Sequence, residues 1–165
     1  MRNLWIVAVV LVVVGCGKNR PAEGVWPAKL AGTENFSEDQ WKSVLNAVTY
    51  LNEGAGKLIV DPNAPEDNYP IYFRLVAPTD ATKQRAGLAT VESDRCTIEI
   101  SNVVYEPTHK EVLIPVVTHE IGHCAGLGHD PASGEIMYKT TGDMKIYSES
   151  ALDRFFSSVL LSTGI

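Results

Sequence analysis

Three of the chain's four histidines lie in one stretch, HEIGHCAGLGHD, at positions 119, 123 and 129. His119 and His123 are four residues apart, so a helix would place both imidazoles on one face, where they could share a metal ion. His129 can reach the same ion only if the helix ends first. Gly126 is the residue type that readily adopts the positive φ of such a turn. The stretch therefore predicts a helix, a turn at Gly126 and a return of the chain toward the helix face.

Three neutral imidazoles leave a fourth position for water, the arrangement typical of catalytic zinc. Glu120 lies about 100° around the helix from His119 and could reach such a water without ligating the metal. It could then act as general base and later donate the proton to the leaving amine. A bare H-E-x-x-H also occurs by chance, but the full set with Gly126 and His129 has a chance frequency on the order of one in 10⁵. We therefore interpret the three histidines, with His123 between the other two, as ligands of one zinc ion and Glu120 as the catalytic base.

The full spacing, H-E-x-x-H-x-x-G-x-x-H, resembles the zinc-binding motif of the metzincin superfamily of metallopeptidases. These families also place a methionine-containing turn beneath the metal, and Met137 lies eight residues after His129, the interval seen in matrixins. The resemblance implies that Met137 forms the floor of the site without binding the metal. It further implies one catalytic zinc and a peptide or protein substrate, and so a zinc metalloendopeptidase.

The resemblance covers most of residues 37–161 and implies an α+β fold. Its twisted, mostly parallel sheet would have about four to five strands with an antiparallel edge strand. An N-terminal helix and an active-site helix would pack on it, followed by a small C-terminal subdomain with the methionine turn and a terminal helix. The resemblance places the edge strand around residues 97–100, where an extended peptide would bind by main-chain pairing.

Local patterns agree with this order of elements. Ser37 and Gln40 have capping-box spacing and begin an amphipathic helix that should stop at residues 54–56. Pro115 is tolerated only in a first helical turn, so the histidine-bearing helix should begin near residues 111–114. A last helix is expected over residues 149–161. Four strand-like runs are expected at 58–60, 71–76, 88–91 and 97–100, the last two joined by a turn at 92–95.

The chain departs from the matrixin pattern directly after the third histidine. Matrixins usually have Ser or Thr there, whereas Asp130 looks more like the adamalysin pattern. Its carboxylate could accept hydrogen bonds from backbone N–H groups near the methionine turn, or it could simply be exposed. Tyr138 directly follows the methionine, so it is not expected to bind the metal as the astacin tyrosine does. Only His109 remains outside the motif, so a second, structural zinc is not expected.

The N-terminus predicts export. An apolar run over residues 4–14 is too short for a membrane span, which needs roughly 20 residues, and fits a signal peptide. Residues 13–16, VVGC, resemble a bacterial lipobox, which implies a signal at 1–15, a lipid on Cys16 and attachment to the membrane of the cell envelope, the outer membrane if there is one. The alternative is an ordinary cleaved signal. Residues 16–33 are interpreted as a tether and residues 34–165 as the peptidase domain.

Two cysteines remain once Cys16 is assigned to the lipid. On a helical wheel Cys124 lies about 120° from the metal direction, so it is a poor zinc ligand and should face the sheet. A disulfide to Cys96, at the start of the expected edge strand, would join the active-site helix of an exported protein to the substrate-binding strand; the alternative is two buried thiols.

Composition limits the other functions. The chain has 165 residues with 14 basic and 20 acidic side chains and no basic cluster, which argues against nucleic acid as a partner. Residues 61–69 hold several acidic side chains but lack the ligand spacing of calcium loops, so calcium is a secondary possibility. Two alternative functions fit the same residues: a non-catalytic, zinc-containing adhesion or inhibitory lipoprotein, and a zinc hydrolase of cell-wall amide bonds.

Overall fold

The protein is built on one five-stranded sheet with strand order β2-β1-β3-β5-β4. The computed structural model describes residues 25–77, 86–105, 112–130, 136–137 and 149–165. Neighbouring strands are parallel except β4, which runs antiparallel to β5 at one edge. This confirms the expected α+β fold with a mostly parallel sheet. The strands are β1 (Val25–Glu34), β2 (Val60–Asp61), β3 (Asn68–Val76), β4 (Gly87–Val91) and β5 (Cys96–Ser101).

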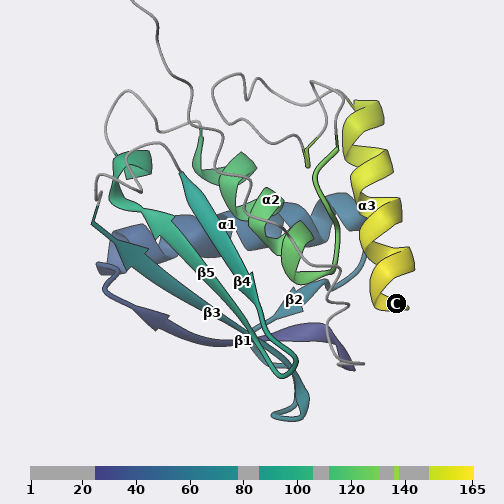
Figure 1. The fold of residues 1–165 in the computed structure, drawn as a ribbon, viewed down its shortest axis with the longest axis horizontal. Helices are drawn as coiled ribbons and strands as arrows, with labels where there is room; N and C mark the ends of the chain where they lie inside the picture. Colours follow the sequence, from purple (N-terminus) through teal and green to yellow (C-terminus); the bar gives the residue numbers. More distant parts are fainter. Residues whose placement is uncertain (1–24, 78–85, 106–111, 131–135, 138–148) are drawn as a thin grey trace, which may run out of the picture.

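Helices α1 and α2 pack against each other and against the sheet, and α3 contacts α1 at the side of the molecule away from the strands (Figure 1). The core lies between the sheet and these helices, and Ile71, Phe73, Ile98 and Ile100 on the strands are at most 1% exposed. None of the helices in the described ranges is long and apolar enough to cross a bilayer. The helices are α1 (Glu38–Ala55), α2 (Leu113–Cys124) and α3 (Glu149–Thr163), with a short 3-10 helix η1 (Asn102–Tyr105) after β5.

Helix α1 begins and ends where its sequence signals predict. The Ser37 side chain accepts from the backbone N–H of Gln40, and the Gln40 side chain accepts from the Ser37 backbone N–H. At the other end Gly56 adopts the left-handed conformation with φ 64°. The helix is thereby fixed in length, and its buried face packs on the core through Val44, Ala47, Val48 and Leu51.

The interpretation of residues 16–33 as a tether is wrong from Val25 onward. Strand β1 begins there and lies inside the sheet, between β2 and β3. Trp26 and Ala28 alternate into the core and are 8% and 0% exposed. Pro27 is tolerated because the pairing of β1 with β3 is irregular at this point, and a proline is acceptable at such a bulge. The folded domain therefore includes residue 25, and residues 1–24 lie outside the described ranges.

The expected edge strand is also wrong by one strand. Residues 96–101 form β5, which is parallel to β3 and covered on its other side by β4. The turn between them forms as predicted, with the Glu92 N–H donating to the Arg95 carbonyl at 2.8 Å. Every second residue of β5 is fully buried, as suits a strand with a neighbour on each side, while β4 is shorter and partly exposed. The antiparallel edge strand is therefore β4.

Candidate metal centre

Helix α2 ends at Cys124, before the third histidine, so the chain can turn back toward the helix face. Pro115 is the third residue of the helix, in the first turn, where its missing N–H removes no helical hydrogen bond. After Cys124 the backbone N–H groups of Gly126 and Leu127 still bond back to the helix, and Gly126 has φ 86°. This left-handed turn sends the chain to His129, which lies outside the helix.

The three histidine side chains converge. One ring nitrogen from each of His119, His123 and His129 lies within 4.8 Å of the others, and the Nε2 atoms of His123 and His129 are 3.2 Å apart. In a tetrahedral zinc site two nitrogens at zinc-bond length are about 3.3 Å apart. Within the described ranges this is the only such group of three metal-ligating side chains.

Backbone carbonyls fix the orientation of two of the rings. His119 Nδ1 lies 2.6 Å from the Ile136 carbonyl, and His123 Nδ1 lies 2.8 Å from the Leu127 carbonyl. A carbonyl can only accept, so Nδ1 carries the proton in both rings and Nε2 keeps its lone pair. Such contacts behind the ligands are typical of metal-binding histidines. The donor set and its orientation therefore fit zinc.

Burial keeps these imidazoles neutral. Desolvation lowers the pKa of His119 from 6.5 to about 4; the bond to the Ile136 carbonyl opposes this, and the neighbouring His123 and His129 lower the pKa further. Desolvation likewise lowers the pKa of His123, against the bond to the Leu127 carbonyl. The neutral form is the one that binds metal, so the site is ready for a cation at neutral pH.

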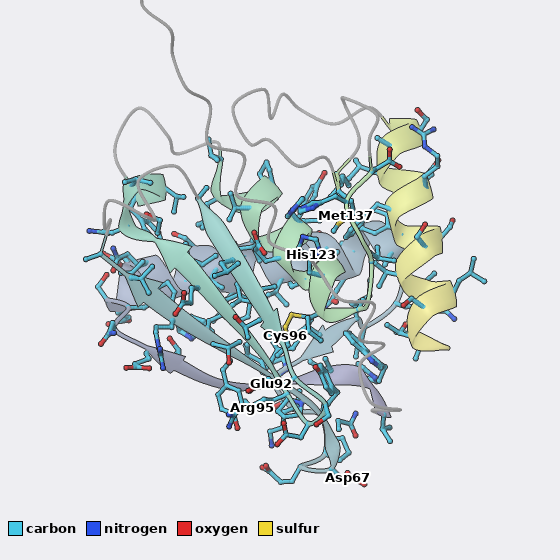
Figure 2. All side chains as sticks on the ribbon, viewed as in Figure 1. Asp67, Glu92, Arg95, Cys96, His123 and Met137 are labelled. Atoms are coloured by element: carbon cyan, nitrogen blue, oxygen red, sulfur yellow. A yellow bond between two sulfur atoms is a disulfide. The ribbon has the colours of Figure 1, made fainter. Side chains whose placement is uncertain are left out.

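Met137 lies beneath the helix that carries the ligands. It is 6% exposed, and a Cβ built on Gly122 would be 2.5 Å from the Met137 sulfur, so only glycine leaves room for this contact. Figure 2 shows Met137 and His123 on the same side of α2. The backbone N–H of Asp130 donates to the Met137 carbonyl at 2.8 Å, which holds the segment after the third histidine to the methionine turn through the main chain. Tyr138 and His109 lie outside the described ranges.

Glu120 points from α2 toward β4. It is 5% exposed, and Gly87 at the start of β4 lies directly against its side chain. No motif in the sequence marks Gly87 or the carbonyls of Ile136 and Leu127 as parts of the site. A glycine opening a strand pattern was the one available signal, because such a residue often marks a close approach.

Cys96 and Cys124 form a disulfide with a Cα–Cα distance of 5.7 Å (Figure 2). Both residues are fully buried. The bond joins the first residue of β5 to the last residue of α2, next to His123. It therefore ties the ligand-bearing helix to the sheet.

Two of the three acidic residues in 61–69, Asp61 and Glu66, make local contacts. The Asp61 carboxylate accepts from the Asn63 backbone N–H at 2.8 Å, and Glu66 forms an ion pair with Lys29. The first contact closes the turn after β2 and the second joins the loop to β1.

Known proteins with a similar sequence pattern or fold are zinc metallopeptidases, in agreement with the three-histidine site. The family model described as Matrixin (Peptidase M10) matches residues 22–153, which include β1 and the whole histidine motif. The archaemetzincin of Methanopyrus kandleri has a similar fold, with a TM-score of 0.52 and 15% identity over 87% of this chain and 97% of that one. No curated protein matches the chain significantly. The chain belongs to the matrixin family of zinc metallopeptidases.

Proposed function

We propose that the chain is a zinc endopeptidase in which Glu120 is the general base. The observation that carries this proposal is the convergence of three imidazole nitrogens beside a buried carboxylate on the same helix. A site that only stored zinc would have no use for a desolvated carboxylate next to its first ligand. Closed structural sites are completed by a fourth protein ligand, and the described ranges hold three.

The chemistry follows from these groups. When bound, zinc supplies Lewis acidity that makes water more acidic and polarises a carbonyl. Glu120 accepts the proton of the attacking water and passes it to the nitrogen of the leaving amine. Since Glu120 is 5% exposed, little bulk water competes for its oxygens.

Strand β4 supplies a surface for the substrate. It is the last strand of the sheet, and in the described part of the chain no strand pairs with its outer edge. An extended peptide could add there by main-chain hydrogen bonds. This favours unfolded segments or loops of proteins as substrates, because a folded strand has already used its backbone groups.

The decisive test compares the chain lacking residues 1–16 with its Glu120→Gln variant on casein and on a peptide library. We expect chelator-sensitive cleavage with one zinc per chain, and a loss of about 10²- to 10⁴-fold in kcat for Glu120→Gln with zinc content unchanged, since the amide keeps the shape but accepts no proton. Glu53→Gln, an exposed change on α1, is the matched control. A Glu120→Gln enzyme within tenfold of wild type would refute the base.

Two other outcomes would favour different functions when cell-wall material is added to the experiment as a third substrate. Full zinc occupancy with no cleavage of any peptide would indicate a non-catalytic adhesion or inhibitory protein. Release of amide-linked fragments from cell-wall material, with the peptide library intact, would indicate a cell-wall amide hydrolase.

We propose further that the enzyme works outside the cytoplasm, held to the envelope membrane by a lipid on Cys16. The support is the apolar run followed by the lipobox-like VVGC in the sequence. The Cys96–Cys124 disulfide agrees with this location, because disulfides persist in oxidising compartments. Membrane fractionation of a Cys16→Ser variant tests the anchor.

A further inference from the structure

We propose that Gly87 is a positioning residue for Glu120: without a side chain, it lets edge strand β4 pack directly on the carboxylate and hold it in its working orientation. The proposal rests on the proposed function of Glu120 as base. Strand β4 would then orient Glu120 through the single residue Gly87, in addition to binding the substrate.

The contacts around Gly87 leave no room for a methyl group. A Cβ built there would lie 2.8 Å from Glu120 Oε1, 2.9 Å from Glu120 Cγ and 2.7 Å from Val116 Cγ1. Carbon atoms in proteins essentially never come so close to non-bonded neighbours. Two of the three contacts are with Glu120, so the glycine backbone forms one wall of the space that its side chain occupies.

The need for glycine at this position is one of space and not of backbone conformation. Among the glycines that the structure describes, those with positive φ are Gly56, Gly126 and Gly164, and Gly87 is not one of them. An alanine could therefore adopt the same backbone angles at position 87. Any effect of the substitution comes from what its Cβ displaces.

Neither β4 nor α2 can easily move away from this contact. Gly87 is paired with Ile100, and the neighbouring Ala86 carbonyl accepts from the Ser101 N–H at 2.9 Å, so β5 holds the start of β4. On the other side, the disulfide ties the end of α2 to β5. Because strand and helix are both held, the Glu120 side chain is the part expected to give way.

A displaced carboxylate would matter for catalysis. Proton transfer requires the base within hydrogen-bond reach of the water, and an error of about 1 Å can cost on the order of 10²-fold in rate. The same stretch of β4 that contacts Glu120 lies at the open edge of the sheet. The contact at Gly87 thus fixes the base relative to the strand on which the substrate would align.

The test is Gly87→Ala in the zinc-loaded enzyme. We expect kcat to fall about 10- to 100-fold, with KM within about threefold and one zinc per chain retained, because the base moves while ligands and substrate edge stay. Gly32→Ala is the matched control: it is also a glycine in a strand, but its Cβ would meet the half-exposed Tyr72 ring at 3.2 Å. Wild-type kcat in Gly87→Ala, or loss of its zinc, would overturn the proposal.

A double-mutant cycle separates positioning from simple packing. Glu120→Ala removes both Glu120 atoms that the new Cβ would meet, so Gly87→Ala should lower the thermal midpoint less in the Glu120→Ala background than in the wild type. An equal drop in both backgrounds would place the clash at Val116 and overturn the proposal. This stability readout stands even if Glu120→Gln proves active, so a failure of the proposed base and a failure of the contact can be distinguished.

A second variant covers the case in which Gly87→Ala does not fold. Val116→Ala removes the tightest of the three contacts, and Gly87→Ala/Val116→Ala retains those with Glu120. The double variant should fold and still show a reduced kcat relative to Val116→Ala alone. Recovery of kcat to the Val116→Ala level would overturn the proposal.

Discussion

The environment of His119 decides its protonation. The free imidazole would take a proton near pH 6.5, whereas burial lowers the pKa of His119 to about 4. Protonation would remove the Nε2 lone pair that faces the other two histidines. The same burial that keeps the ligand ready for metal therefore makes the metal-free protein sensitive to acid.

The metal-free protein should lose stability as the pH falls from about 6.5 to about 4. In that window the unfolded chain binds a proton at His119 and the folded chain does not, so the unfolded state is favoured by up to about 3 kcal/mol at the lower end. His123 acts in the same direction. Urea denaturation of zinc-stripped protein between pH 7.5 and 4.5 measures the slope. His119→Asn, whose amide can still donate to the Ile136 carbonyl, should give a shallower slope; equal slopes would contradict this account.

At the residue scale, the sequence was informative where function depends on spacing along one helix. The positions of His119, His123 and Gly126 follow from the period of the α-helix and the need for a turn. No local sequence pattern predicts the role of Gly87, because that role depends on how close β4 comes to α2 in the folded chain.

At the element scale, the predictions of a tether over residues 16–33 and of an edge strand at 97–100 are wrong for physical reasons. The sequence predicts a tether in place of β1 because Pro21, Gly24, Pro27 and Gly32 are residue types typical of loops, although Trp26, Ala28 and Leu30 alternate toward the core in the fold. The hairpin of β4 and β5 was predicted, but its turn does not say which strand joins the parallel sheet. That choice depends on β3, which precedes the hairpin in the chain and pairs with β5 and not with β4.

The disulfide should contribute substantially to stability. Linking residues 28 apart restricts the unfolded chain by an amount worth about 3 to 4 kcal/mol. Replacing Cys96 and Cys124 together with alanine should lower the free energy of unfolding by about this much in urea denaturation. Because both cysteines are fully buried, dithiothreitol added to the native enzyme should react slowly and reduce the bond readily only after denaturation. A loss below about 1 kcal/mol would contradict the chain-entropy argument.

At the scale of the whole molecule, the proposed lipid anchor on Cys16 would determine where the enzyme is found. With a lipid on Cys16, the full-length protein should sediment with membranes and incorporate a labelled fatty acid, since acyl chains provide stable attachment. Cys16→Ser with the signal intact should lose the label and leave the membrane fraction. A Cys96→Ala/Cys124→Ala variant is the control and should keep the label. Label on Cys16→Ser would contradict the proposed attachment.

The position of β1 also limits how far an anchored enzyme could act. Strand β1 begins at Val25, so only the eight residues 17–24 lie between it and Cys16. This segment is shorter than the tether up to residue 33 that the sequence predicted. Even fully extended, that segment spans at most about 30 Å, less than the length of a larger folded protein. Such an enzyme would process only polypeptide that comes within the length of this segment plus the distance from Val25 to the active site, so nearness to the membrane would select its substrates together with their sequence.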